Sequence, residues 1–197
     1  MDLISPREAL AAVLAVAQPL PVRRMPLAQA VGHILARDIF ADRDQPPTDR
    51  SAMDGYAVRA EDASGKEVFL RVVGESAAGK PFRGRLARGA CVRIYTGACI
   101  PAGADAVIIQ EQTEVRNDRV RLLAAVAVGA NIRRQGEEAR RGAVVVKAGM
   151  PLGGAQVGMA AAVGYRSVMV HPRPRIAILS TGNELATGTG RIRACQI

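Results

Sequence analysis

Aromatic residues are scarce in this sequence: tryptophan is absent, and Phe, Tyr and Trp together account for 3% of the 197 residues. Proteins that bind single-stranded nucleic acid use aromatic rings on which the bases stack. The chain nevertheless carries 27 Lys and Arg against 18 Asp and Glu, a formal net charge of +9, and such an excess attracts anionic partners. Because the basic residues come with few rings and no recognisable nucleic-acid-binding motif, we expect small anions rather than nucleic acid as ligands.

Cysteine and histidine are also rare. The three cysteines, Cys91, Cys99 and Cys195, are odd in number and lack the spacing of a zinc site or a disulfide framework. The two histidines, His33 and His171, are too few to favour a histidine metal site or a Ser-His-Asp triad. Any chemistry is therefore expected from carboxylates, hydroxyl groups and arginines.

Long apolar runs are missing. The sequence has no stretch of about 18 or more apolar residues. Its N-terminus, with Asp2, Arg7 and Glu8, lacks the basic start and hydrophobic block of a secretory signal. We therefore expect no membrane partner and a cytoplasmic location. With 49% hydrophobic residues, the chain has enough apolar side chains for a substantial core.

Two helices are predicted within the first 40 residues. Ser5, Pro6 and Glu8 form the pattern of a capping box with proline at the first helical position, so a helix should begin there. The apolar residues of this helix are Ala9, Leu10, Val13, Leu14 and Ala17. A second helix is expected after Pro26, because one apolar stripe recurs at helical spacing and contains Leu27, Ala30, Val31, Ile34 and Leu35.

Beyond residue 49 the periodicity changes from helical to short β-rich runs separated by Gly and Pro. Strands are predicted at residues 68–73, 91–94, 106–110 and 119–122, with turns near residues 79–81, 89, 101–103 and 117–118. After residue 142 the pattern predicts a strand at 144–147, a helix at 155–163 closed by Gly164, and a strand at 167–170.

The unbroken apolar run at residues 176–180 follows a stiff linker at 172–174 and is typical of a buried parallel strand. Directly after it come Thr181, Gly182, Asn183 and Glu184, at the place where open α/β sheets bind their ligands. A ligand site at the start of an α/β domain and a simple turn both explain this stretch.

Residues 45–58 form the part of the sequence that points most clearly to a functional loop. Pro46 and Pro47 hold the backbone extended in front of a polar loop, and Asp54 stands next to Gly55, a residue type that can adopt positive φ. From spacing alone, this Asp-Gly pair is either a plain turn or an exposed turn whose carboxylate reaches a ligand or a metal ion.

Two further stretches offer groups that bind anions. Thr96 and Gly97 follow a predicted strand and combine a hydroxyl with close backbone approach, which suits an oxyanion, although a strand-end turn also fits. Residues 133–141 mix arginines and glutamates whose i,i+4 pairs are typical of a solvated helix. Gly136 disfavours that helix.

Four strings in collinear order give a resemblance to a known family. They are Ser-Ala-Met-Asp-Gly-Tyr-Ala at residues 51–57, Arg-Ile-Tyr-Thr-Gly-Ala at 93–98, Asn-Ile-Arg-Arg-Gln-Gly-Glu at 131–137 and Ser-Thr-Gly-Asn-Glu-Leu at 180–185. Through them the chain resembles, over nearly its whole length, the MoeA family of molybdopterin molybdenumtransferases. Two positions depart from the family pattern, because Glu138 and Asn183 stand where the family commonly has aspartate.

The resemblance and the periodicity together imply an α+β, multidomain architecture. A discontinuous helical and mixed α/β region is expected from residues 1–49 and 142–172, with a β-rich module inserted at residues 50–141. Residues 173–197 are expected to be the start of an α/β (MogA-like) domain. The chain would then be the N-terminal portion of a longer protein, inactive by itself.

The function that the resemblance implies is Mg²⁺-dependent insertion of molybdate into adenylyl-molybdopterin with release of AMP. It implies catalytic roles for Asp54, Thr96 and Glu184, with Asp54 as a ligand of Mg²⁺, and substrate or anion binding by Ser51, Arg133, Arg134, Thr181 and Gly182. It also implies a homodimer, in which Asp54 and Thr96 of one subunit face Glu184 of the other, and a MogA-type adenylyltransferase as a partner. A non-catalytic interaction or scaffold role is the alternative.

Overall fold

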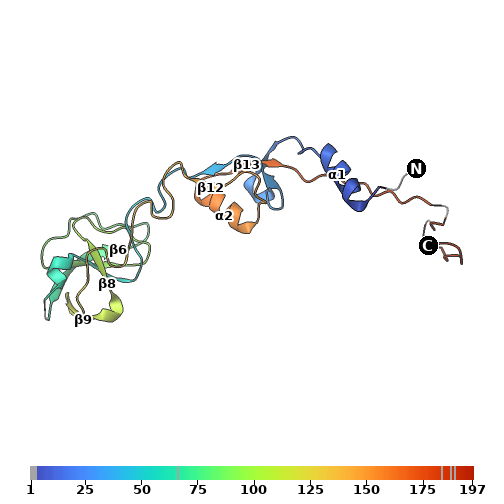
Figure 1. Cartoon of the computed structure of the whole chain (residues 1–197). Coiled ribbons are helices and arrows are strands. Elements are labelled where there is room, and N and C mark those ends of the chain that lie inside the picture. The colour runs from blue at the N-terminus through green and yellow to red at the C-terminus, as the bar shows by residue number, and fades with distance from the viewer. Residues whose placement is uncertain (1–3, 66, 183, 187, 189) are drawn as a thin grey trace.

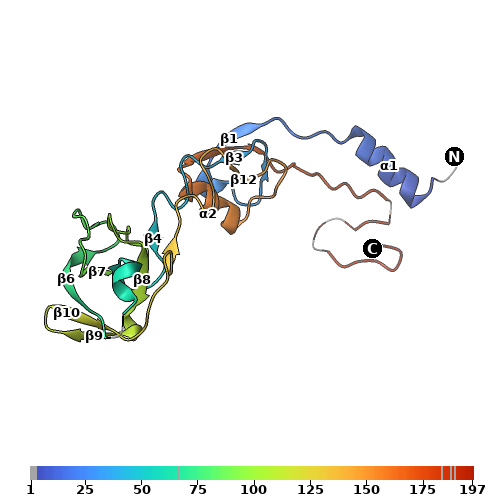
Figure 2. The same ribbon diagram turned by 60° about the vertical axis from the view of Figure 1, so that its left-hand side comes forward.

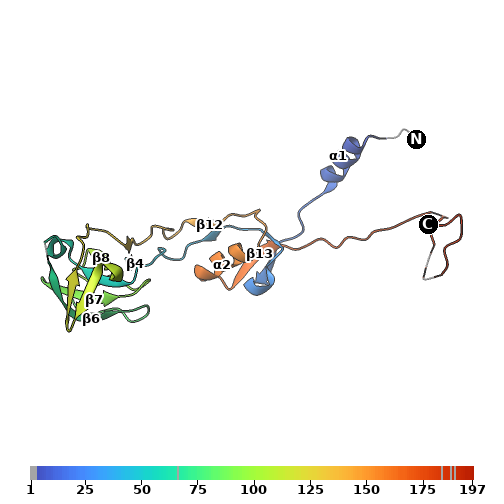
Figure 3. The same ribbon diagram turned by 90° about the horizontal axis from the view of Figure 1, so that it is seen from below.

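The chain is elongated in all three views, with two folded parts along its length (Figures 1, 2 and 3). The computed structural model describes residues 4–65, 67–182, 184–186, 188 and 190–197. One part is built around a three-stranded sheet and the other around a six-stranded sheet. Most of the regular structure is therefore β, and the multidomain α+β expectation is met only in part.

The helix α1 (Pro6–Val16) begins where the capping box predicts. The Ser5 hydroxyl accepts a hydrogen bond from the Glu8 N–H at 3.3 Å, and the Glu8 carboxylate accepts one from the Ser5 N–H at 2.7 Å. None of the helix's residues is buried, and its apolar side chains are exposed, Leu10 by 60% and Leu14 by 62%. Capping rather than packing defines this helix.

The prediction of a second helix, made from the apolar stripe at residues 27–35, is wrong. In its place the chain forms β1 (Arg23–Pro26), the short 3₁₀ helix η1 (Leu27–Gln29) and β2 (Ile34–Leu35). Both strands pair antiparallel with β13 (Ser167–His171), which lies between them. A local sequence pattern cannot show pairing with a strand so far along the chain, and this pairing determines the structure of residues 23–35.

Burial along the same stripe follows the sheet and not a helix. Leu27, Ala30 and Leu35 are buried, whereas Val31 and Ile34 are 51% and 40% exposed. Side chains of β2 alternate between the two faces of the sheet, so the neighbours Ile34 and Leu35 point to opposite sides.

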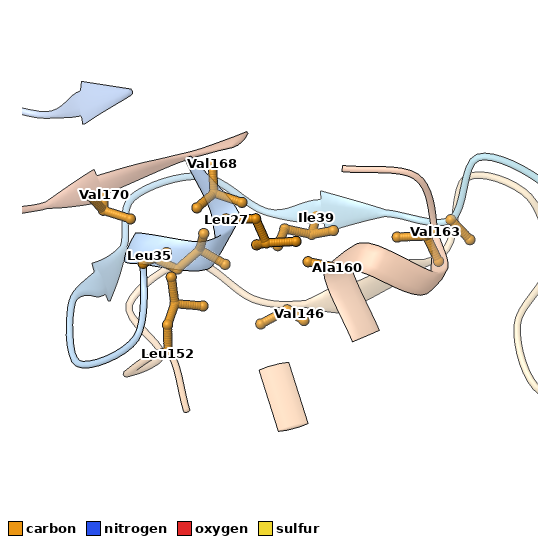
Figure 4. Close-up of a cluster of buried hydrophobic side chains, with 11 residues drawn as sticks. Leu27, Leu35, Ile39, Val146, Leu152, Ala160, Val163, Val168 and Val170 are labelled. Atoms are coloured by element: carbon orange, nitrogen blue, oxygen red, sulfur yellow. The ribbon is translucent and has the colours of Figure 1, made fainter. Parts of the chain in front are cut away.

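The core of this part lies among the three-stranded sheet, a two-stranded pairing and one helix. The pairing joins β3 (Ile39–Phe40) to β12 (Val144–Val146), and the helix is α2 (Gly154–Ala162), which ends before Gly164 at φ +88°. These elements lie close to the predicted ranges. Figure 4 shows the buried apolar side chains that meet here: Leu27, Leu35, Ile39, Val146, Leu152, Ala160, Val163, Val168 and Val170.

The six-stranded sheet has the strand order β8-β5-β7-β6-β10-β9. The strands are β5 (Gly55–Val58), β6 (Phe69–Ser76), β7 (Ala90–Ile94), β8 (Ala106–Ile109), β9 (Thr113–Arg116) and β10 (Arg119–Leu122), with short 3₁₀ helices η2 (Ala60–Ala63) and η3 (Gln110–Gln112) between them. All neighbours are antiparallel except β6 and β7. The four predicted strands are confirmed to within a few residues, and β5 and β9 are additional.

Both faces of the sheet are covered at β5, which is buried at every position. Tyr56 and Val58 pack in a core with Leu70 and Ile108, and the neighbouring Ala57 packs in a second core on the other face. A strand buried on both faces shows no alternation of polar and apolar residues. The period-2 pattern that predicts a half-buried strand is therefore absent from β5.

The Asp-Gly pair suggests a positive φ at Gly55, but Gly55 is the first residue of β5 and is not one of the described glycines with positive φ. A Cβ atom on Gly55 would lie 1.9 Å from the carbonyl oxygen of Ile108 on β8. The glycine is therefore required for close approach of two strands, not for a turn.

Two antiparallel segments, residues 41–51 and 132–143, connect the two folded parts (Figure 2). They pair as β4 (Arg50–Ser51) and β11 (Ile132–Arg133) at the end near the six-stranded sheet. Nearer the first core, the Gln45 N–H donates to the Ala139 carbonyl at 2.7 Å. We call residues 41–51 and 132–143 together the double connection. It carries most of the residues that line the candidate site.

The segment after β13 runs away from both sheets (Figure 3). Residues 176–180 form no strand, and Ile176, Ile178 and Leu179 are 79%, 89% and 87% exposed. The buried parallel strand predicted here is wrong, since no neighbouring strand among the described residues offers a hydrogen-bonded ladder or cover for the apolar run. In the described part of the chain, none of the helices has the length and apolar character needed to cross a membrane.

Candidate active site

Asp54 and Thr96 lie side by side, although 42 residues separate them in sequence. Asp54 directly precedes β5 and Thr96 comes shortly after the end of β7, and the antiparallel register that pairs Gly55 with Ile94 brings both to one edge of the sheet. The Thr96 backbone N–H and hydroxyl each donate to the Asp54 Oδ1 atom at 2.8 Å. The sheet therefore places an exposed carboxylate in a fixed orientation.

The hydrogen bonds to Asp54 favour its charged form. The Thr96 N–H, with a further contribution from the Thr96 hydroxyl and from the positive charge of Arg93, lowers the pKa of the Asp54 carboxyl below its ordinary value of 3.8. Asp54 is thus a carboxylate at neutral pH. It is suited to holding a cation or orienting a donor, and not to delivering a proton.

Arg93 is held beside Asp54 by two aromatic rings. Its guanidinium carbon lies 5.1 Å from the ring centre of Tyr56 and 5.0 Å from that of Tyr95, close enough for cation–π attraction. The same group donates to the Gln110 side-chain oxygen at 2.7 Å. Arg93 belongs to the 93–98 string, yet sequence reasoning assigned it no role, because only the fold shows it stacked next to Asp54.

Ser51 is buried and its hydroxyl is already engaged. The Oγ atom donates to the Met53 carbonyl at 2.6 Å, and the Ser51 carbonyl accepts from the Gly97 N–H at 2.8 Å. These contacts connect the loop that carries Asp54 to the loop that carries Thr96. Ser51 therefore shapes the site, and its hydroxyl does not project freely toward a ligand.

A polar pocket of about 460 Å³ opens next to this pair. Asp54 itself does not line it and reaches it through Thr96. The lining residues come from the double connection, the Thr96 loop and the end of α2, and they are Arg43, Gln45, Pro46, Pro47, Arg50, Ser51, Ala52, Thr96, Gly97, Arg133, Glu138 and Ala162. Three arginines at one pocket fit the anionic ligands that the net charge favours.

The arginines predicted to bind anions do not lie on a helix. Arg133 is in β11, and its guanidinium forms ion pairs with Glu137 at 3.0 Å and Glu138 at 2.6 Å. Arg134 pairs with Asp49 at 2.7 Å. The solvated-helix interpretation is therefore wrong, although one of its pairs, Arg133 with Glu137, does form. Arg133 lines the pocket, and Arg134 ties the double connection together.

Carboxylates of the double connection hold its backbone. Asp49 accepts from the Gln135 N–H at 2.8 Å, and Asp44 accepts from the Arg141 N–H at 2.9 Å. These backbone hydrogen bonds are the main reason that the pKa of each carboxyl lies below its ordinary value. Sequence reasoning missed both residues. Acidic side chains that face the backbone of a segment far along the chain leave no local signal.

Thr181, Gly182 and Glu184 are not brought to this site. They are exposed and lie in the segment after β13, which the views place at the opposite end of the molecule from the six-stranded sheet (Figures 1 and 2). The Glu184 carbonyl accepts from the Ile197 N–H at 2.8 Å, so this segment folds back on itself. Asn183 lies outside the described residues.

The oxygen atoms near Asp54 fit a magnesium site in which one carboxylate oxygen is combined with substrate phosphates and water. Among the described residues, no group of three or more His, Cys, Asp or Glu side chains could enclose a metal ion. Asp54 Oδ1 is occupied by Thr96, and Oδ2 makes no hydrogen bond to a described residue. Mg²⁺ commonly binds through one or two carboxylates together with substrate phosphates and water, and a single carboxylate oxygen meets that requirement.

Comparison with known proteins shows which family the chain resembles. Residues 4–164 match the family model described as "MoeA N-terminal region (domain I and II)". The chain is 39% identical to molybdopterin molybdenumtransferase 1 of Mycobacterium tuberculosis, covering 85% of this chain and 43% of that protein. It is 38% identical to the molybdopterin molybdenumtransferase of Haemophilus influenzae, covering 91% and 44%. The chain thus spans less than half the length of these curated relatives.

A solved structure shares the fold. The molybdopterin biosynthesis moeA protein of Pyrococcus horikoshii OT3 superimposes with a TM-score of 0.82 at 38% identity, over 88% of this chain and 47% of that one. The match of the family model over more than half of the chain and the agreement in fold lead to the same conclusion. The chain belongs to the MoeA family, of which it carries the N-terminal region.

Proposed function

We propose that this chain supplies part of a molybdopterin molybdenumtransferase, which acts in molybdenum cofactor biosynthesis by inserting molybdate into adenylyl-molybdopterin with release of AMP. The observation that carries the proposal is the Asp54 carboxylate, held ionised by Thr96 at the edge of a pocket lined by Arg43, Arg50 and Arg133. Family membership and the names of the relatives support it.

The charges of the site suit this reaction. Molybdate and the phosphoanhydride of the substrate are both negative, and arginines concentrate such ligands and bind their oxygens through planar forks. Mg²⁺, bound to substrate phosphates, would supply positive charge where negative charge develops as the anhydride breaks. Asp54 would orient that ion through its Oδ2 atom, while Thr96 holds the carboxylate in place. No histidine is needed for these roles.

The remaining expectations belong to the same proposal. Glu184, with Thr181 and Gly182, would complete the site from the second subunit of a homodimer, and a MogA-type adenylyltransferase would supply the substrate. The domain boundaries proposed are residues 1–49 with 142–172, then 50–141 and 173–197. What supports a site shared between subunits is that, in the single chain, the segment after β13 and the six-stranded sheet lie at opposite ends of the molecule (Figure 1).

Turnover by two forms of the protein tests the proposal. The first is the 197-residue chain, and the second, called here the joined protein, is this chain followed by the part of the Mycobacterium tuberculosis relative that the chain does not cover. Each is mixed with adenylyl-molybdopterin, molybdate and Mg²⁺, and AMP release is followed. We expect sustained release from the joined protein and none from the chain alone, because the described residues at 176–182 form no strand and therefore no strand-end phosphate site.

Two outcomes would contradict the proposal. Sustained AMP release from the chain alone would show that its own residues suffice, so that the chain does not supply merely part of the enzyme. A well-folded joined protein that binds a protein partner but inserts no molybdate would favour the interaction role instead.

A further inference from the structure

Arg50 differs from the other arginines of the pocket in having no partner among the described residues. Its Nε atom is enclosed by protein and makes no hydrogen bond, and its guanidinium forms no ion pair with a described residue. By contrast, Arg43 is paired with Asp42 at 2.5 Å and Arg133 with Glu137 and Glu138. Arg50 is therefore the arginine of this pocket whose charge no carboxylate of the described chain neutralises.

An unpaired cation in a partly buried position is costly. Arg50 is partly buried, and its Nε atom has lost contact with water without gaining an acceptor. Buried donors in native proteins nearly always have a partner, and an exception calls for a specific cause such as a ligand. The Arg50 side chain is not needed to hold β4 in place, because the backbone does so. The Ser51 N–H donates to the Ala98 carbonyl, and Arg50 pairs with Arg133 in the strand register.

The pocket around Arg50 is shaped for a small polar ligand. It holds about 460 Å³ and includes the Thr96 loop, so a group bound at Arg50 lies in the same pocket as the residue that holds Asp54. A guanidinium presents five N–H donors in a planar fork and binds two oxygens of one tetrahedral anion at once. A lysine or glutamine at this position would not reproduce that geometry.

We propose that Arg50 is the oxyanion receptor of this pocket, binding either molybdate or the phosphate group of a nucleotide, and that it sets the affinity of the site for tetrahedral anions. For the identity of the natural ligand, this inference rests on the function proposed above. The oxyanion accepts hydrogen bonds from the part of the Arg50 guanidinium that lines the pocket and neutralises its charge. Arg133, already held by two carboxylates, then has a secondary role.

Anion binding to the 197-residue chain tests the inference without any turnover. Isothermal titration calorimetry with molybdate in one arm and AMP in the other is carried out on the wild-type chain and on Arg50→Gln, Arg50→Lys and Arg119→Gln. Arg119→Gln removes the same charge from an exposed position on β10, in the outer half of the six-stranded sheet, and controls for net charge. Circular dichroism confirms that each variant is folded.

We expect Arg50→Gln to weaken binding of the preferred anion by about tenfold or more, because a charge-assisted bidentate contact is lost. Arg50→Lys should lie between Arg50→Gln and wild type, and Arg119→Gln within about twofold of wild type, since an exposed distant charge is screened by salt. Tighter binding of molybdate would identify the free ion as the ligand, and tighter binding of AMP a nucleotide phosphate.

Equal affinity of wild type and Arg50→Gln for both anions, or no binding of either anion by wild type, would overturn the inference. Neither result would touch the proposed function, which depends on AMP release by the joined protein. Conversely, a joined protein without activity would leave the measured effect of Arg50 on anion binding intact.

Discussion

Thr96 donates two hydrogen bonds to a single oxygen of Asp54, one from its backbone N–H and one from its hydroxyl, both at 2.8 Å. The backbone bond depends only on the sheet register, whereas the hydroxyl bond depends on the residue type. Together they fix the orientation of the carboxylate and leave its second oxygen for other ligands. The two contributions can therefore be separated by substitution.

Thr96→Val in the joined protein should lower AMP release by about tenfold while the protein stays folded, because one hydrogen bond to a charged group is lost and the backbone bond remains. Thr96→Ser keeps the hydroxyl and should retain most activity. The pKa of Asp54 should rise toward its ordinary value of 3.8 in Thr96→Val, so the acid limb of the pH–rate profile should move to higher pH. Equal activity of the Val and Ser variants would show that the hydroxyl plays no part.

Asp54→Asn in the joined protein should reduce molybdate insertion by at least about a hundredfold, since the charge used to orient a cation at the reacting phosphates is gone. The amide oxygen of the introduced asparagine can still accept from Thr96, so the unfolding temperature should change little. AMP release and thermal unfolding, measured on the same preparation, distinguish a loss of activity from a loss of folding. Insertion at the wild-type rate by this variant would make Asp54 a plain loop residue.

Asp49→Asn should lower the stability of the chain at neutral pH and have no effect in acid. The Gln135 N–H first, and then Arg134, hold the pKa of the Asp49 carboxyl below its ordinary value of 3.8. A lowered pKa in the folded state gives stability that is present above pH 3.8 and is lost as the pH falls through the folded-state pKa. Thermal unfolding followed from neutral pH into acid should show two curves that converge below pH 3.8. A gap that stays constant with pH would contradict this account.

Gly55→Ala should destabilise the six-stranded sheet by about 3 kcal/mol, because the new methyl group meets the Ile108 carbonyl and the backbone has to shift. The matched control is Gly158→Ala in α2, where an added Cβ meets nothing within 4 Å. This control should gain about 0.5–1 kcal/mol, since alanine is the better helix former. Urea unfolding of both variants compares the two glycines, and similar free energies of unfolding would show that β5 and β8 can move apart at little cost.

Elements with local signals could be predicted from the sequence. The capping box at Ser5 gives the start of α1, and β10 has the predicted ends, residues 119–122. The stripe from Leu27 to Leu35 misleads because burial at those positions comes from pairing with β13, far along the chain. The apolar run at residues 176–180 misleads for the opposite reason: it has the composition of a buried strand and lacks neighbours among the described residues.

Only part of the candidate site could be predicted as residues, and its geometry could not be predicted. The strings at residues 51–57 and 93–98 point to Asp54 and Thr96, and only the register of β5 and β7 shows that the two side chains touch. Arg50 lies one residue outside the 51–57 string, and its lack of a partner among the described residues is a property of the folded chain. Pairing and burial between distant segments therefore account for what the sequence leaves open.

The pairing of β4 with β11 has a consequence for how this protein can be rebuilt. The chain enters the six-stranded half at Arg50 and leaves it at Arg133, and these two residues are antiparallel neighbours, about 5 Å apart at their Cα atoms. A stretch whose ends lie side by side can be excised or exchanged for another without stretching what remains, because closing so small a gap needs only a short turn. Recombination between relatives at these two positions should therefore yield folded hybrids that differ in only one half.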